Sequence, residues 1–273
     1  MRLSVIIPTF NTAAMTLRCC RAVLETMPPD TEVIVADDAS TDGTAALLPP
    51  EVRVVRLEVN RGFAGAANRG VEAASGDIIL VLNSDAVVQP GALQAMLDAF
   101  EDPKLGIAGA QLLNEDGTEQ WSGGPTPTLV WMIAVVSGLG RYRRALLGDR
   151  RHPRVSVDWV SGAAMAIRRE AWTPFSEKFL FYCQDLKLCI DTRDAGWAVR
   201  IVPEARVVHL LGATIAGASK QKAELLWPDL LTWGRDRYGR VWGAFARVVL
   251  VLAALLRGPK FIRAAWRLAT DRS

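Results

Sequence analysis

The stretch that most constrains the fold lies at residues 77–88 and reads DIILVLNSDAVV. Five consecutive apolar residues, 78–82, are too few and too β-branched for a buried helix, so they predict a strand covered on both faces. The run stops at Asn83-Ser84-Asp85. In an extended chain Asn83 and Asp85 point to one side and Ser84 to the other. Paired oxygen ligands of this kind suit Mg²⁺ or Mn²⁺, which also bind substrate phosphates; the alternative is a polar turn without a ligand.

The first 113 residues alternate between strand and helix patterns. Strands are predicted at 3–7, 32–36, 52–57, 78–82 and 106–113, and helices at 13–27, 63–74 and 91–100, with a short helix ending at Pro49-Pro50 and with Pro90 in the first turn of the last helix. This alternation predicts an α/β fold with a mostly parallel central sheet flanked by helices.

Polar side chains follow three of these strands. Thr9 and Asn11 follow the first strand, Asp37 and Asp38 the second, and the Asn83-Ser84-Asp85 turn the fourth. Because ligands of such sheets bind beyond the carboxyl ends of the strands, we expect the three loops to converge. Asp37-Asp38 either caps the helix that follows or accepts the N3–H of a pyrimidine base.

Two common phosphate-binding loops are missing from the sequence. No GxxxxGK[ST] motif occurs, and Gly62, Gly65 and Gly70 do not form GxGxxG behind a strand. We therefore expect the phosphates of a bound nucleotide to be held through a metal ion.

A long insert at 114–158 interrupts the alternation and holds an apolar patch, LVWMIAVV, and a basic run at 141–154. After the insert, a strand is predicted at 160–167, a helix at 184–195 and a pair of strands within 197–208.

The overall composition is that of a folded intracellular protein. Half of the 273 residues are apolar, which is enough for a full core. The four cysteines lack zinc-binding spacing and predict a reducing, cytosolic compartment. Pro8 and Asn11 interrupt the first apolar run before it reaches signal-peptide length, so we interpret the run as a strand.

The C-terminal segment is basic. Residues 235–273 hold nine Lys and Arg against two Asp, a net charge of +7, whereas the whole chain carries +3, which leaves −4 for the remainder. The apolar stretch 241–256 contains Arg247 and is shorter than the roughly 20 residues of a spanning helix. The following segment, KFIRAAWRLATDR, has the pattern of a helix that lies on anionic lipid. The alternatives are a helix packed on the sheet and a homodimer contact.

Two further expectations concern partners. The patch LVWMIAVV and its basic neighbours are candidates for a second membrane contact. Nucleic-acid binding is not expected, because the basic tail interleaves aliphatic rather than stacking aromatic side chains.

Seven segments, taken in order, resemble family 2 inverting glycosyltransferases of the GT-A fold, and most of all their rhamnosyltransferase-like branch. They read SVIIPTFN, DDASTDGT, NRGFAGAANRG, LVLNSDA, WVSGAAMAIRREAW, FLFYCQDLKLCIDTRDAGW and IVPEARVVH, and they cover about residues 3–214. The resemblance implies transfer of a sugar, with rhamnose as the candidate, from a dTDP- or UDP-sugar to a glycan or polyprenyl-linked acceptor. It implies a role in cell-envelope polysaccharide synthesis, with the protein peripheral on the inner face of the cell membrane.

The resemblance also implies roles for single residues. Asp38, with Asp37 beside it, matches the carboxylate that reads the uracil or thymine ring. Asn83 and Asp85 match the ends of the family's DxD motif, where Mg²⁺ or Mn²⁺ binds. The other assignments are Thr9, Asn11, Asn68 and Ser84 in the nucleotide pocket, His209 as a further metal ligand, Asp185 as the general base, and Trp159, Gly162 and Gln184 on the acceptor side.

The sequence departs from the family pattern around the base. The family shows Glu-Asp followed by a second acid, whereas this chain has Gln184 before Asp185 and Lys187 at the second position. We expect Lys187 to lower the pKa of Asp185 and weaken it as a base.

These observations predict a transferase domain at 1–215, made of a donor half at 1–113, the insert at 114–158 and an acceptor half at 159–215, followed by a membrane-associating segment at 216–273. The main alternative is a nucleotide- or glycan-binding relative of the same fold that has lost turnover through Gln184 and Lys187. A nucleotidyltransferase is disfavoured, because it needs a Gly-rich basic loop after the first strand and IPTFN supplies none.

Overall fold

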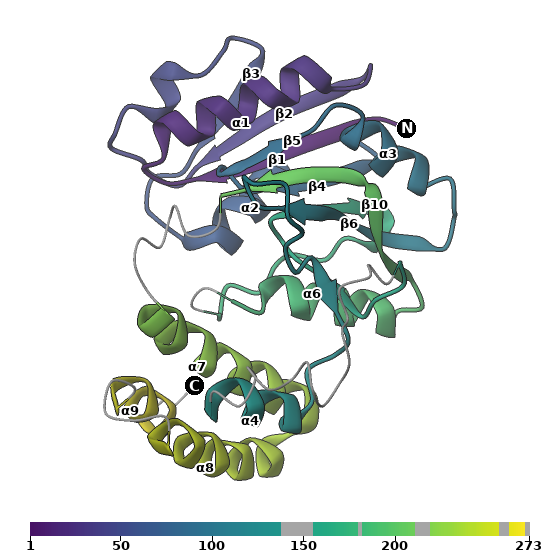
Figure 1. Ribbon diagram of the computed structural model, residues 1–273. Helices are drawn as coiled ribbons and strands as arrows, with labels where there is room; N and C mark the ends of the chain where they lie inside the picture. Colours follow the sequence, from purple (N-terminus) through teal and green to yellow (C-terminus); the bar gives the residue numbers. More distant parts are fainter. Residues whose placement is uncertain (138–154, 180–181, 211–218, 257–261, 271–273) are drawn as a thin grey trace. The chain divides into compact units, whose positions relative to one another are not determined.

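The computed structural model describes residues 1–137, 155–179, 182–210, 219–256 and 262–270 (Figure 1). The chain divides into two compact units. The first, called here the sheet unit, comprises Met1–Pro125, Pro153–Glu177 and Gln184–Thr214. The second, the helical unit, comprises Thr126–His152, Lys178–Cys183 and Ile215–Ser273. Part of the insert therefore groups with the C-terminal segment rather than with the predicted transferase domain.

The sheet unit contains an eight-stranded sheet in the order β3-β2-β1-β4-β9-β6-β10-β5 (Figure 1). Its strands are β1 Leu3–Thr9, β2 Thr31–Asp37, β3 Val52–Arg56, β4 Ile78–Leu82, β5 Ala86–Val88, β6 Leu105–Leu113, β9 Ala164–Arg168 and β10 Ala198–His209. Four of the neighbouring pairs are parallel, as predicted, and the pairs of β9 with β4 and β6 and of β10 with β5 are antiparallel. The sheet is therefore mixed.

Helices cover both faces of this sheet, as its apolar strands require. They are α1 Ala13–Thr26, α2 Gly62–Glu72, α3 Ala92–Ala99 and α6 Gln184–Asp194, with short 3₁₀ helices η1 Thr44–Leu47 and η3 Arg169–Ala171. Leu3, Val5 and Ile7 of β1 pack with residues of α1 and α3, whereas Ile6 packs with residues of α2 and α6. Gly70 of α2 lets this helix approach β1 closely, because a Cβ there would lie 2.3 Å from Ile6 Cγ2. The result is a three-layer α/β/α arrangement.

Several predicted elements differ in detail from the structure. The predicted strand at 160–167 is two strands, β8 Trp159–Val160 and β9, and β8 pairs with β7 Gly123–Gly124 in a small second sheet. The predicted strand pair within 197–208 is the single strand β10, whose pairing with β6 shifts register between Val202 and Arg206. Pro90 lies outside α3, because Gly91 adopts φ 81° and caps that helix.

The helical unit is formed by α4 Leu129–Ser137, α7 Ser219–Tyr238, α8 Arg240–Leu256 and α9 Ile262–Thr270. Helix α8 packs against α4, α7 and α9. Met132 and Val136 of α4 are fully buried. Val130 of the same patch is 77% exposed, so the patch LVWMIAVV is only partly core and the second membrane contact stays a prediction; its basic neighbours at 141–154 lie outside the described residues.

None of the helices within the described residues combines the length and the apolar character that crossing a membrane requires.

Candidate active site

The three polar loops meet at the carboxyl ends of β1, β2 and β4, as predicted. The amide of Asp38 donates to the carbonyl of Thr9 (2.9 Å), and the amide of Asn11 donates to the Ser40 hydroxyl (3.0 Å). The Asn11 side chain returns this contact, because its Oδ1 accepts from the Thr41 amide (2.8 Å). Asn11 has φ 51°, a left-handed conformation that asparagine tolerates well. These hydrogen bonds hold the first two loops together.

A buried hydroxyl cluster connects the first loop with the third. Thr9 Oγ1 lies 2.8 Å from Thr12 Oγ1 and 2.6 Å from Thr16 Oγ1, and Thr12 Oγ1 lies 3.2 Å from Ser84 Oγ. The side chains of Thr9 and Ser84, which the resemblance places in the nucleotide pocket, therefore face protein hydroxyls. Sequence reasoning missed Thr12 and Thr16, although Thr12 directly precedes the predicted helix and Thr16 follows Thr12 by four residues.

Asp37 and Asp38 have different surroundings. Asp37 is fully buried, and its Oδ2 lies 3.3 Å from Arg56 Nη1. Asp38 Oδ1 and Oδ2 accept the amides of Arg61 (2.7 Å) and Gly62 (2.8 Å). Asp38 thus caps α2, a helix distant in sequence, and not the helical turn that follows it. Burial raises the pKa of Asp38, and each carboxylate oxygen keeps a second lone pair.

The Asn83-Ser84-Asp85 turn lies beside His209. His209 Nε2 is 3.3 Å from Asp85 Oδ1 and 3.3 Å from Asn83 Nδ2, whereas Ser84 faces the hydroxyl cluster. The two ends of the motif therefore lie on one side, as predicted, although the Ala86 amide closes a turn onto the Asn83 carbonyl (3.0 Å). The antiparallel pairing of β5 with β10 places His209 opposite Ala86. Sequence reasoning missed β5, the short strand that makes this contact.

Gln120 fixes the His209 ring from the other side. Its Nε2 donates to the carbonyl of His209 (2.6 Å) and reaches the Leu113 carbonyl (3.1 Å) and Asn114 Oδ1 (3.0 Å), so its Oε1 faces His209 Nδ1 at 3.2 Å. An amide oxygen only accepts hydrogen bonds, so Nδ1 carries the ring proton. In the neutral imidazole, Nε2 then presents its lone pair toward Asp85 and Asn83. Sequence reasoning did not single out Gln120.

These residues fit a divalent cation. A carboxylate oxygen and an imidazole nitrogen lie 3.3 Å apart, and with a neutral imidazole both are acceptors that a cation would satisfy. The second ring nitrogen is held by an amide oxygen, the arrangement that orients metal-binding histidines. Within the described residues no cluster of three or more His, Cys, Asp and Glu side chains is placed to hold a metal, so the remaining ligands would be Asn83, water and substrate phosphate.

Asp185 lies at the start of α6 and receives two backbone hydrogen bonds. The amide of Gly162 donates to Oδ2 (2.9 Å), and the amide of Leu186 donates to Oδ1 (2.8 Å). Burial raises the pKa of Asp185 in spite of these donors. The expectation that Lys187 lowers this pKa is wrong, because Lys187 Nζ pairs with Asp191 Oδ2 at 2.5 Å.

Of the other predicted residues, Gly162 and Gln184 lie next to Asp185, whereas Trp159 and Asn68 make other contacts. Gly162 is closely packed, since a Cβ there would lie 3.3 Å from Asp185 Cβ. Gln184 is buried next to Asp185. Trp159 packs edge-on against Trp121, with ring centroids 4.9 Å apart. Asn68 binds the backbone of Phe175 through both amide atoms (2.8 and 3.0 Å), so none of its short hydrogen bonds reaches the other candidate residues.

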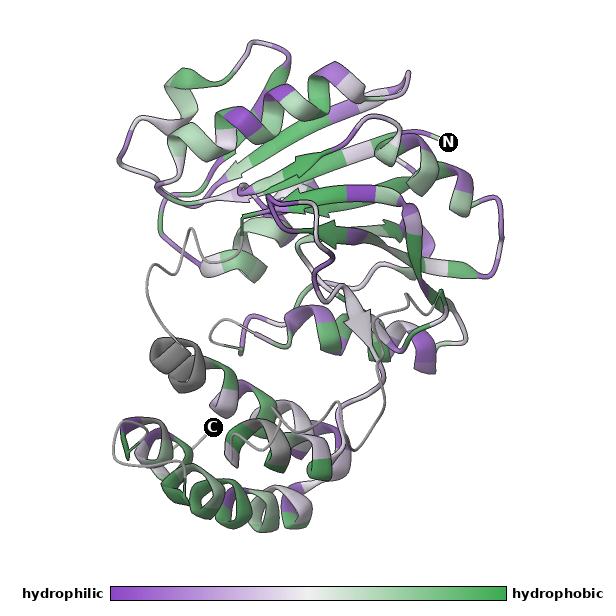
Figure 2. Cartoon of the chain, in the orientation of Figure 1, coloured by the Kyte–Doolittle hydropathy of each residue, from purple (hydrophilic) through white to green (hydrophobic). Residues whose placement is uncertain are grey.

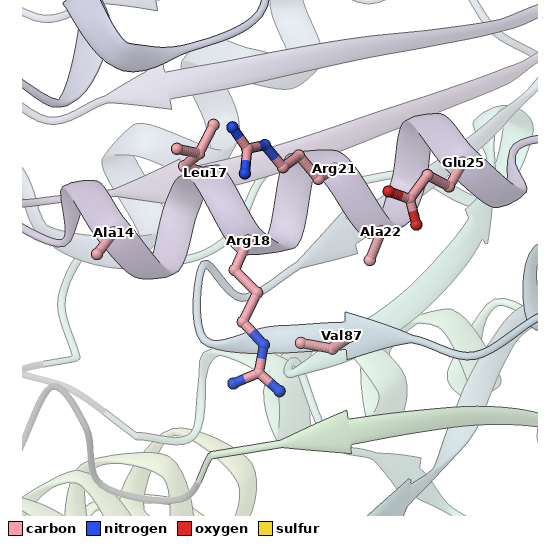
Figure 3. Close-up of a pocket in the computed structure, with 7 residues that line it drawn as sticks. All are labelled: Ala14, Leu17, Arg18, Arg21, Ala22, Glu25 and Val87. Atoms are coloured by element: carbon pink, nitrogen blue, oxygen red, sulfur yellow. The ribbon is translucent and has the colours of Figure 1, made fainter.

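A surface pocket of about 310 Å³ lies elsewhere on the sheet unit, between α1 and β5 (Figure 3). Figure 3 shows Arg18 extending from α1 toward the strand that carries Val87. None of the residues that line this pocket is a candidate site residue, and we assign it no role.

Comparisons with solved structures show the fold. A mannosyltransferase from Pyrobaculum calidifontis in complex with GDP-Man and Mn²⁺ aligns with all of this chain and 76% of its own, at a TM-score of 0.64 and 18% identity. Glucosyl-3-phosphoglycerate synthase from Mycobacterium tuberculosis aligns over 88% of this chain and 79% of its own, at a TM-score of 0.60 and 19% identity. The sheet unit therefore has the GT-A glycosyltransferase fold, as predicted.

Sequence comparisons agree with this fold. An N-acetylglucosaminyl-diphospho-decaprenol L-rhamnosyltransferase from Mycobacterium tuberculosis is 28% identical over 267 residues, which is 88% of this chain and 86% of that protein. The sequence model of the family described as Glycosyl transferase family 2 matches residues 4–171, more than half of the chain. The same span holds the three converging loops, and the chain therefore belongs to glycosyl transferase family 2.

Proposed function

We propose that the chain transfers rhamnose from a dTDP- or UDP-sugar to a polyprenyl-linked glycan, with inversion at the anomeric carbon. A family 2 glycosyltransferase acts on a sugar donor, and the rhamnosyltransferase relative, which is similar over most of both chains, supports this donor sugar and acceptor class. The single observation that carries the proposed chemistry is the placement of Asp85 and His209, 3.3 Å apart, beside the loops that hold Asp37 and Asp38.

The nucleotide is proposed to bind over the first two loops. Asp38 is held by two backbone amides and keeps lone pairs for the N3–H of a pyrimidine ring. Asp85, Asn83 and His209 would hold Mg²⁺ or Mn²⁺, whose charge offsets the negative charge of the departing diphosphate.

Asp185 is proposed to act as the general base. Its two backbone hydrogen bonds orient the carboxylate, and each oxygen keeps a lone pair for the proton of the acceptor hydroxyl. The raised pKa makes it a stronger proton acceptor than an exposed aspartate. The acceptor oxygen attacks the anomeric carbon as its proton passes to Asp185, and the bond to the diphosphate breaks on the opposite face.

The second candidate is a binding protein of the same fold without turnover. Gln184 and Lys187 favour it, because they stand where the family has two acids. Among these groups only Asp185 retains a carboxylate.

Titration calorimetry with UDP, dTDP and GDP, each with Mn²⁺ and with chelator, tests the donor site. We expect one pyrimidine diphosphate to bind tightly with Mn²⁺ and much more weakly with chelator. The transfer assay then uses dTDP-rhamnose and a polyprenyl-diphosphate-linked N-acetylglucosamine, and NMR of the product assigns its anomer. Metal-dependent nucleotide binding without transfer would support the second candidate, and retention at the anomeric carbon would contradict the mechanism.

A further inference from the structure

Helix α8 presents its large apolar side chains outward. Six of them are between 50% and 87% exposed: Val241, Phe245, Val248, Leu252, Leu255 and Leu256. Their spacing of three or four residues places them along one side of the helix. Figure 2 colours most of α8 as hydrophobic. The buried residues of the opposite side are small apart from Leu250, namely Gly243, Ala246, Ala253 and Ala254, and the half-buried Trp242 packs on Gly234 of α7. A helix that only filled the core would show the reverse distribution.

Helix α9 continues this exposed apolar character. Ile262 and Trp266 are 55% and 66% exposed and lie one turn apart, while Ala265 and Leu268 are buried. Helices α8 and α9 pack against each other within the helical unit. We refer to the exposed apolar side chains of both helices as the apolar face.

Arginines of α8 and α9 accompany the apolar face. Arg240 and Arg247 are seven residues apart, about two turns, so they lie along one edge of α8. Arg263 and Arg267 are exposed beside Ile262 and Trp266. Neither α8 nor α9 contains Asp or Glu. A second copy of the chain would bring these arginines against their own counterparts, whereas an anionic surface matches their charge.

We propose that the apolar face lies in the interface of an anionic lipid bilayer. Exposed Phe, Leu and Val would enter the boundary between headgroups and acyl chains, Trp266 would sit at headgroup level, and the arginines would reach the lipid phosphates. Only the reason for membrane binding rests on the proposed function, since a polyprenyl-linked acceptor resides in a bilayer. The vesicle-binding test needs neither donor nor acceptor, so the membrane proposal and the proposed function can fail separately.

The test is flotation of the full-length protein with phosphatidylcholine vesicles, with and without phosphatidylglycerol. The double variant Phe245→Asp, Leu252→Asp carries two acids on the apolar face at sites that are exposed, so the fold should be retained. The control is Leu47→Asp, Val59→Asp, which changes two exposed apolar residues of the sheet unit in the same way. Circular dichroism melting compares the folding of all three proteins.

We expect the wild type and the control to float with phosphatidylglycerol vesicles, and the Phe245→Asp, Leu252→Asp variant to lose at least about tenfold in partitioning. A second variant, Arg240→Gln, Arg247→Gln, should reduce the preference for phosphatidylglycerol over phosphatidylcholine. Equal flotation of wild type and face variant would overturn the proposal. A second result would also overturn it: a wild type that does not bind vesicles, sediments as a dimer in sedimentation velocity, and becomes a monomer with the Phe245→Asp, Leu252→Asp substitutions. In that case the apolar face would contact a second copy of the chain.

Discussion

The regions around Asp85 and around Asp185 use the same side chain in different surroundings. Asp85 faces the ring of His209 at 3.3 Å, so two ligand-type groups meet at one point. Among the described residues Asp185 accepts hydrogen bonds from two backbone amides, those of Gly162 and Leu186, and burial raises its pKa. The first arrangement suits a cation and the second suits a proton. Residue type alone therefore does not assign the role, and the neighbours do.

The largest effect that would test this difference is expected for Asp185→Asn. We expect turnover to fall by about 10²- to 10⁴-fold, because Asn cannot accept the proton, while metal-dependent nucleotide affinity stays unchanged. Steady-state kinetics and calorimetry measure the two quantities. Asp191→Asn is the control, since Asp191 lies on the same helix and pairs with Lys187. Turnover similar to wild type in Asp185→Asn would remove Asp185 as the base.

The reciprocal change is Asp85→Asn. We expect Mn²⁺-dependent nucleotide affinity to fall by about 100-fold, with little change in binding measured under chelator. Calorimetry with and without Mn²⁺ separates the metal-dependent part of the nucleotide affinity from the metal-independent part. If the loss were the same in chelator, Asp85 would contact the nucleotide directly and the comparison with Asp185 would fail.

Gln120→Leu tests the orientation of His209. The leucine cannot accept the Nδ1 proton, so we expect Mn²⁺ affinity to fall by about tenfold, as for other residues that orient metal ligands. Mn²⁺ binding followed by electron paramagnetic resonance gives the readout without turnover. Gln120→Glu, which keeps the acceptor oxygen, should restore much of the affinity. Gln94→Leu, on the exposed side of α3, is the control, and an equal loss there would argue against an orienting role.

The smallest effect is a shift in pH dependence. Because burial raises the pKa of Asp185, kcat should fall with decreasing pH at a pH above the ordinary range of aspartate. The free energy of unfolding depends on pH in the opposite direction to kcat. A carboxylate whose pKa is raised in the folded state binds more protons there, so the free energy of unfolding decreases as pH rises from the unfolded pKa to the folded one. Asp185→Asn should remove this decrease, and its melting temperature at neutral pH should be no lower than that of wild type.

Local patterns predicted the central elements well. Residues 78–82 form β4 within the predicted bounds, and α1 and α2 begin within one residue of expectation. The converging loops followed from strand–helix alternation alone. The prediction failed for β5 and β8, which are two or three residues long, because such strands form through pairing with distant partners and have little pattern of their own. The predicted strand at 160–167 is interrupted around Gly162 for the same reason, because β8 and β9 pair with different distant strands.

The sequence by itself determined the α/β fold, the polar strand ends and the motif Asn83-Ser84-Asp85, because hydrophobic periodicity and turn residues act over short distances. Only the tertiary structure decided what each polar side chain faces. It turned Asp38 toward the amides of α2, paired Lys187 with Asp191 rather than Asp185, and placed Gln120 against His209. The exposure of the large apolar residues of α8 likewise depends on which side of the helix packs into the helical unit. Hydrogen-bond partners and burial are set by neighbours that are far apart in the chain, so no local pattern encodes them.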